Sequence, residues 1–161
     1  MRHASKFRSK SNEVCDDPQR ARVKALELLT GRELTGRQLC DKLKQRGFSE
    51  SACQSVLDSF VEVSLIDDRR TAEMLLQKYM RMAYSRSTMR QKLQQAGLSR
   101  ELIDEQIATV DEGMELENAR KQARRVASRP TEKAMASLQR KGFRSSQTRA
   151  AVGETHEVDP D

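Results

Sequence analysis

A ten-residue phrase occurs three times along this chain, and each copy carries a glycine at the same place. The copies read KLKQRGFSES at 42–51, KLQQAGLSRE at 92–101 and SLQRKGFRSS at 137–146. A glycine just past a helix end adopts the left-handed conformation cheaply and lets the chain turn sharply. Each copy therefore predicts the end of one helix, a tight turn and the start of the next helix.

The residues around each glycine fit a Schellman turn, in which the glycine is preceded and followed by apolar side chains that touch each other. Three sets of residues match this pattern: Leu43, Gly47 and Phe48; Leu93, Gly97 and Leu98; and Leu138, Gly142 and Phe143. Ser49 and Ser99 come next and are expected to cap the following helices. The third copy has Arg144 at that place, so we expect Ser145 to cap instead.

The similarity between the copies extends beyond the turns. Leu57, Ile107 and Val152 each lie ten residues after their glycine, and the glycines are spaced 50 and 45 residues apart. Such spacings are typical of helical repeats that pack in series. The sequence predicts an all-α fold of three tandem three-helix repeats in an elongated, curved array. The expected boundaries are a disordered tail at 1–17, repeats at 18–66, 67–113 and 114–153, and an acidic disordered tail at 154–161.

Helix-start signals support these boundaries. Thr35 and Gln38 have capping-box spacing, and Asp67 or Asp68 is expected to cap the helix that opens the second repeat. Both carboxylates also favour the positive end of the helix dipole. The third repeat is expected to begin after Gly113. Its core positions are poor in Leu and Ile, so we expect it to fray first.

Composition limits the other possibilities. The chain has 36% hydrophobic and 4% aromatic residues and no Trp, which favours a thin helical core. No apolar run reaches 18 residues, and MRHASKFRSK lacks the apolar segment of a secretory signal. Cys15, Cys40 and Cys53 lack metal-ligand spacing. We expect Cys40 and Cys53 to be small, buried apolar residues. We therefore expect a reduced, cytoplasmic protein without a membrane segment.

Basic residues are concentrated in two regions. Residues 115–149 have a net charge of +7 and residues 67–92 a net charge of +4, whereas 98–117 hold one Arg and seven acids. Basic helix faces attract polyanions, of which nucleic acid is the commonest in the cytosol, although they also occur as plain solvated surfaces. The candidate binding residues are Arg70, Lys78, Arg81, Arg90, Lys121, Arg124, Arg125, Lys133, Arg140 and Lys141.

The sequence gives little support for catalysis. The two histidines, His3 and His156, lie near the two ends, and the chain has no glycine-rich phosphate loop. Asp67 and Asp68 are adjacent at a helix start, where carboxylates usually cap rather than bind metal. We expect a non-enzymatic protein with no cofactor and no metal.

The motif LIDDRRTAEML at 65–75, together with the three repeats, resembles the RecX family of bacterial recombination regulators over about residues 20–152. The most specific part is IDD-x-R-x-A at 66–72. The family pattern has an aromatic residue where this chain has Thr71. It also has Lys-Gly where this chain has Met82 and Ala83.

The resemblance implies a cytoplasmic modulator of the RecA recombinase in homologous recombination, DNA repair and the SOS response. We expect the chain to be a monomer. Such a protein lies in the groove of the RecA–DNA filament and inhibits ATP hydrolysis, filament extension and strand exchange. It binds single-stranded DNA weakly. Weak binding to duplex DNA is an open alternative. Two alternatives remain from the residues alone. One is a sequence-independent nucleic-acid-binding helical protein that acts without RecA, and the other is an adaptor that binds only protein.

Overall fold

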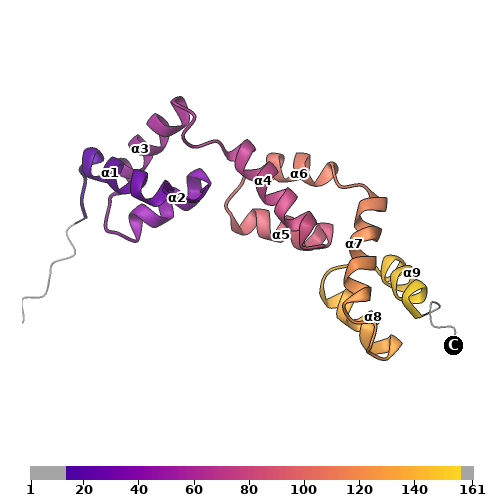
Figure 1. The fold of residues 1–161 in the computed structure, drawn as a ribbon. Coiled ribbons are helices and arrows are strands. Elements are labelled where there is room, and N and C mark those ends of the chain that lie inside the picture. The colour runs from indigo at the N-terminus through magenta and orange to yellow at the C-terminus, as the bar shows by residue number, and fades with distance from the viewer. Residues whose placement is uncertain (1–13, 157–161) are drawn as a thin grey trace, which may run out of the picture. The chain divides into compact units, whose positions relative to one another are not determined.

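The computed structural model describes residues 14–156, and every regular element in that range is a helix (Figure 1). These residues form two compact units, of which one ends at Ile66 and the other begins at Asp67. The first unit holds α1–α3 and the second holds α4–α9. The prediction of an all-α fold built from three-helix repeats is confirmed.

The first unit packs α1 (Pro18–Leu29), α2 (Gly36–Lys44) and α3 (Glu50–Glu62) around a core that includes Phe60. The predicted capping box at α2 is present, because Thr35 accepts from Gln38 N at 3.1 Å and Gln38 accepts from Thr35 N at 3.2 Å. Cys40 and Cys53 are buried, as expected. Burial raises the pKa of the Cys40 thiol to about 11, so this thiol stays protonated at neutral pH.

Residues 14–17 differ from the expected disordered tail. The Cys15 N–H donates to Gly47 O at 2.7 Å, and the Ser49 N–H donates back to Cys15 O at 2.9 Å. Asp16 accepts hydrogen bonds from Ser49 and Ser51, and Asp17 caps α1. Backbone pairing and carboxylates at two helix starts therefore hold this segment. The remainder of the predicted tail, including His3, lies outside the described residues.

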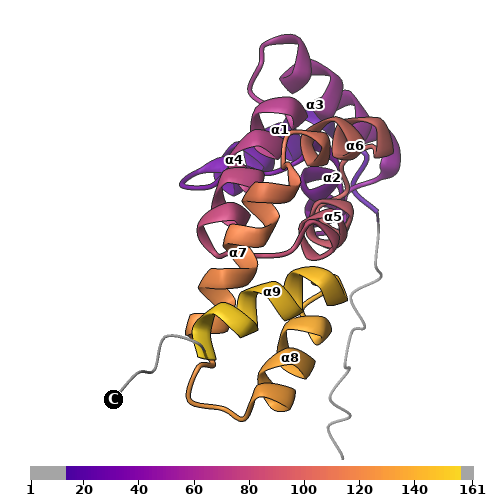
Figure 2. The same ribbon diagram turned by 90° about the vertical axis from the view of Figure 1, so that its right-hand side faces the viewer.

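The second unit contains six of the described helices (Figures 1 and 2). Their bounds are α4 (Asp68–Arg81), α5 (Arg86–Gln95), α6 (Arg100–Ala108), α7 (Glu112–Arg124), α8 (Thr131–Arg140) and α9 (Ser145–His156). One core cluster, with Met89, Leu93 and Ile103, lies among α4–α6. Another lies among α7–α9 and consists mostly of Ala and Val with Leu138 and Phe143, so the expected poverty in Leu and Ile is confirmed.

The three predicted turns are confirmed in detail. Gly47, Gly97 and Gly142 have φ values of 86°, 82° and 80°. The long Schellman hydrogen bond is present in each, from Phe48 N to Leu43 O, Leu98 N to Leu93 O, and Phe143 N to Leu138 O, at 3.2, 3.4 and 3.3 Å. The repeated phrase thus encodes the same helix–turn–helix geometry each time.

The predicted cap at Ser145 is wrong. Ser145 is the first residue of α9, and Arg144 occupies the position before it. The Thr148 N–H donates to Arg144 O at 2.9 Å, and the Arg144 N–H donates to the Gln147 side chain at 3.1 Å. The Gln147 side chain thus accepts from the N–H of the cap residue itself, whereas Ser49 and Ser99 accept from the N–H groups of Ala52 and Leu102 inside their helices.

Two boundaries in the third repeat differ from those predicted from the sequence. Gly113 lies inside α7, which follows the N-cap Asp111, whose carboxylate accepts from Met114 N at 2.8 Å. Helix α9 continues to His156, so the first three residues of the expected disordered tail at 154–161 are helical. Residues 157–161 lie outside the described part of the chain.

The start of α4 is capped as predicted, and the turn after its end lines the candidate binding site. Asp67 is its N-cap and accepts from Arg70 N at 3.0 Å, while Asp68 is the first helical residue. Past its end, the buried Ala83 has a φ of 56°, in the left-handed region. This is the position where the RecX pattern has glycine, the residue that adopts this conformation at least cost. Thr71, in place of the usual aromatic residue, is buried, and its hydroxyl has no hydrogen-bond partner among the described residues.

Candidate functional site

The side of α7 that faces the second repeat is polar. Asn118 and Gln122 are 1% and 3% exposed and lie one turn apart on the same helix face. Asn118 Nδ2 donates to Tyr84 O at 2.9 Å, and Gln122 Nε2 donates to Met82 O and Ala83 O, both at 3.0 Å. These amides satisfy the carbonyls of the turn after α4. They therefore fix the third repeat against the second.

Glu115 continues this face of α7 and is 3% exposed. One carboxylate oxygen accepts from Arg86 N at 3.0 Å, and the other accepts from Gln147 Nε2 at 3.0 Å. Arg86 is the first residue of α5, so the carboxylate lies at the positive end of that helix. This buried charge is satisfied by groups from α5 and α9.

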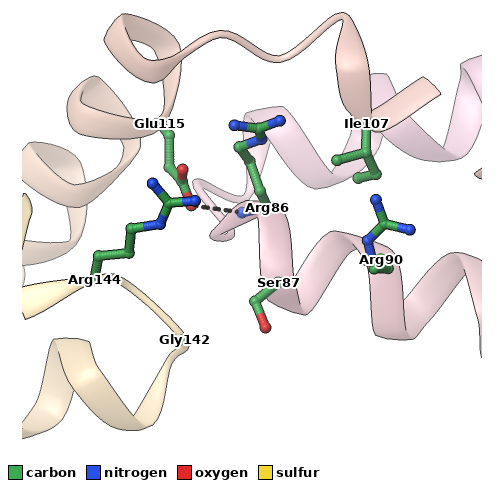
Figure 3. A pocket seen from close by; sticks show the side chains of 7 residues that line it. All are labelled: Arg86, Ser87, Arg90, Ile107, Glu115, Gly142 and Arg144. Carbon is green, nitrogen blue, oxygen red and sulfur yellow. Dashed lines mark hydrogen bonds between the residues drawn. The ribbon is translucent and has the colours of Figure 1, made fainter. Parts of the chain in front are cut away.

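A cavity of about 340 Å³ lies beside Glu115, and Arg86, Arg90 and Arg144 contribute to its lining (Figure 3). Arg90 forms an ion pair with Asp104. Arg144 lies 3.7 Å from a carboxylate oxygen of Glu112. Carboxylates of the chain itself therefore already pair with Arg90 and Arg144, two of the three arginines of this cavity.

A second cavity, of about 660 Å³, is lined by the turn after α4 and by residues at the ends of α7 and α8. We call it the basic groove. Its lining includes four cationic residues, Arg81, Arg125, Arg140 and Lys141. The described residues that line it include no carboxylate. The groove therefore concentrates positive charge that the chain does not neutralise locally.

Lys141 connects the groove to the junction between the repeats. Its Nζ donates to Gln122 Oε1 at 2.6 Å, and its carbonyl accepts from Ser85 Oγ at 2.7 Å and Thr88 Oγ1 at 2.9 Å. Burial of the ammonium group, together with nearby Arg125 and Arg129, lowers the pKa of Lys141. Like charges thus crowd at this point, and a bound anion would relieve their repulsion.

The aromatic residue of the groove is already engaged within the second repeat. The Tyr84 ring centroid lies 5.8 Å from that of Tyr79, and Lys92 Nζ lies 5.1 Å from the Tyr84 centroid. These ring–ring and cation–π contacts engage the half-buried Tyr84 ring within the second repeat. Charge is therefore the main feature that the groove offers to a ligand.

Two further cavities involve the basic helices. One, of about 490 Å³, is lined by Arg129, Lys133 and Arg140 together with small residues, so Arg140 borders both this cavity and the basic groove. The other, of about 430 Å³, includes Arg124 and Glu154. Glu154 accepts two hydrogen bonds from Arg120, each at 2.7 Å, so the chain supplies an anion there as well.

The structure brings some of the predicted binding residues together and separates others. Arg81, Arg125, Arg140 and Lys141 meet in the basic groove, and Lys133 lines its neighbour. Arg90 and Arg124 line cavities that contain a carboxylate. The other candidates, Arg70, Lys78 and Lys121, lie on exposed faces of α4 and α7, outside these four cavities.

Sequence reasoning missed the buried amides and Arg129. A signal for the amides was present, since Asn118 and Gln122 fall on the same helical stripe as Ala119 and Ala123.

No cluster of potential metal ligands occurs among residues 14–156. Within the same residues, no helix is both long enough and apolar enough to cross a membrane.

Comparison with known proteins identifies the family. The model described as RecX, first three-helix domain, matches residues 21–60, and the model described as RecX, second three-helix domain, matches residues 67–106. A regulatory protein RecX from Halorhodospira halophila is 31% identical over 141 residues, which cover 84% of this chain and 88% of that protein. The chain belongs to the RecX family. The resemblance inferred from LIDDRRTAEML and the repeats is thus confirmed.

Other RecX proteins show how far the similarity reaches. A regulatory protein RecX from Streptomyces lividans is 35% identical over 118 residues, or 72% of this chain. The chain spans only 63% of the length of that relative. The crystal structure of RecX from Lactobacillus salivarius superposes with a TM-score of 0.75 at 18% identity, covering 88% of this chain and 97% of that one. This likeness supports a shared fold.

Proposed function

We propose that this chain is a cytoplasmic, monomeric regulator that binds in the groove of the RecA–DNA filament. It inhibits RecA ATP hydrolysis, filament extension and strand exchange. The observation that carries the proposal is the basic groove between the second and third repeats of a RecX-family chain. It gathers Arg81, Arg125, Arg140 and Lys141 where the described lining includes no carboxylate. A DNA-containing filament is the kind of polyanionic partner that such a surface fits.

The proposed mechanism is binding alone, without a cofactor or a chemical step. Residues 67–113 and 114–153 act as the repeats that occupy the filament groove, while residues 18–66 support them. Inhibition requires a difference in affinity, because a ligand shifts an equilibrium only toward the state that it binds more tightly. The chain must therefore bind an inactive filament arrangement, or a filament that is not growing, more tightly than an active one.

The test measures single-strand-dependent ATP hydrolysis by RecA and filament length, with this chain added from substoichiometric to equimolar amounts. We expect both to fall. Binding to the filament should also persist at a salt concentration that abolishes binding to naked DNA, since contacts with RecA add to the salt-sensitive phosphate contacts. A chain that binds naked DNA but leaves RecA hydrolysis and filament length unchanged would instead be a nucleic-acid-binding protein that acts without RecA.

A further inference from the structure

We infer that the basic groove and the adjacent cavity along α8 form one track for the backbone phosphates of a single nucleic-acid strand. The track consists of Arg81, Arg125, Arg129, Lys133, Arg140 and Lys141. This inference rests on the proposed function and deepens it, because it names the part of the filament that the groove contacts. Phosphates, rather than acidic side chains of RecA, are its ligand.

The first argument is the difference between the four cavities. Glu115 lines the cavity of Figure 3, and Glu154 lines the one that contains Arg120 and Arg124. The two cavities of the track have no carboxylate among their described lining residues. No ion pair joins any of the six track cations to a carboxylate among residues 14–156. The chain satisfies its other basic cavities internally and leaves this pair for an external anion.

The second argument is continuity. Arg140 lines both cavities, so the cations run from the end of α4 past Arg125 and Lys141 onto α8. Lys141 lies close enough to Arg125 and Arg129 for both to lower its pKa. A nucleic-acid strand carries one phosphate charge per nucleotide along its whole length and can meet several such cations at once. A single carboxylate side chain could neutralise only one position of the run.

The third argument concerns what the track does not offer. Tyr84, the aromatic residue of the basic groove, is half-buried and already contacts Lys92 and Tyr79, so it is a poor platform for base stacking. The Gln122 amide already bonds to Met82, Ala83 and Lys141. Contacts to phosphate position a strand without reading its sequence. Binding should therefore be similar for strands of different base composition.

The experiment measures binding of the full chain to fluorescent oligo(dT) and oligo(dA) by anisotropy across a salt series, without RecA. Six phosphate contacts to a single strand predict that the slope of log K against log salt is about −4. The double variant Arg125→Gln/Arg140→Gln should reduce its magnitude to about −3 for both oligonucleotides. Arg149→Gln is the matched control, because Arg149 is exposed on α9 in the same repeat and lies outside both cavities. It should leave the slope near the wild-type value.

A further probe identifies the anion. Poly-glutamate, which carries carboxylates in place of phosphates, should bind more weakly than oligo(dT) at the same salt concentration. Tighter binding of poly-glutamate than of oligo(dT), or an unchanged slope in a double variant with wild-type circular dichroism, would overturn the inference. Because RecA is absent, these results are independent of the RecA hydrolysis assay that tests the proposed function.

Discussion

The Nε2 atom of Gln122 lies 3.0 Å from the carbonyl oxygen of Ala83, the buried residue with left-handed backbone after α4. The same side chain accepts a hydrogen bond from Lys141 through its Oε1 atom. One amide on α7 therefore joins the turn of the second repeat to a cation of the third. All three residues line the basic groove, so its shape depends on this junction.

Replacing Gln122 with Ala should destabilise the second unit. The change leaves the carbonyls of Met82 and Ala83 without their donor, and an unsatisfied buried polar group costs about 1–3 kcal/mol. Gln77→Ala is the control, because Gln77 is exposed on α4 and such substitutions usually change stability by less than about 0.5 kcal/mol. Urea unfolding followed by circular dichroism gives both values. Equal stability of the two variants would show that the junction does not hold the repeats together.

Alanine at two of the repeated glycines should have unequal effects. Gly47→Ala adds a Cβ with no atom within 4 Å, so its cost is that of the left-handed backbone, about 1–2 kcal/mol. Gly142→Ala carries the same backbone cost, and its Cβ would lie 2.8 Å from Ser85 Oγ and 3.2 Å from Ser87 Cβ.

The Gly142 variant should therefore be the less stable of the two. The clash would also displace Ser85, which donates to Lys141 O, and so disturb the junction between the repeats. Thermal unfolding of both proteins makes the comparison. A Gly142→Ala protein as stable as Gly47→Ala would mean that α5 moves away from this turn at little cost.

Affinity for single-stranded DNA should depend on pH through Lys141. Burial, with Arg125 and Arg129 nearby, holds the pKa of this lysine below its usual 10.5. The ammonium is charged below the lowered pKa and neutral above it, so affinity should fall as the pH rises through that value. A bound phosphate favours the charged form, so binding in this window should take up protons.

Lys141→Arg separates this effect from general alkaline weakening, since a guanidinium stays charged throughout the range. We expect the affinity of this variant to vary less with pH than that of the wild-type protein, in anisotropy titrations from neutral to alkaline pH. Identical pH profiles for the two proteins would show that Lys141 does not contact the bound strand.

The turns were predictable because their geometry is local. A glycine with apolar residues four before it and one after it fixes the Schellman turn, and Gly47 shows the expected conformation. The fold class and the caps at Thr35 and Asp67 follow from similarly short patterns. The failure at Arg144 has the same origin, since the cap was assigned by residue type. Arg144 occupies the cap position instead, and its N–H donates to the side chain of Gln147, three residues later.

The groove was only half predictable, because it depends on how two repeats pack. Helical periodicity identified exposed cations on α4 and α7, but it could not show that Arg81 would meet Arg140 while Lys78 and Lys121 remained outside. The buried amides Asn118 and Gln122 were missed for a related reason. A polar side chain is assigned to the surface unless its partner is known, and here the partners are carbonyls about 40 residues earlier in the chain.

Single-strand-dependent ATP hydrolysis by RecA tests the central claim most directly, when the wild-type chain is compared with Arg125→Gln/Arg140→Gln and Arg149→Gln at equal concentrations. The wild-type chain and Arg149→Gln should inhibit hydrolysis at substoichiometric to equimolar ratios. The double variant, with its helicity preserved, should require a higher concentration for the same inhibition. A wild-type chain that leaves hydrolysis unchanged at equimolar ratio would contradict the proposed regulation of RecA.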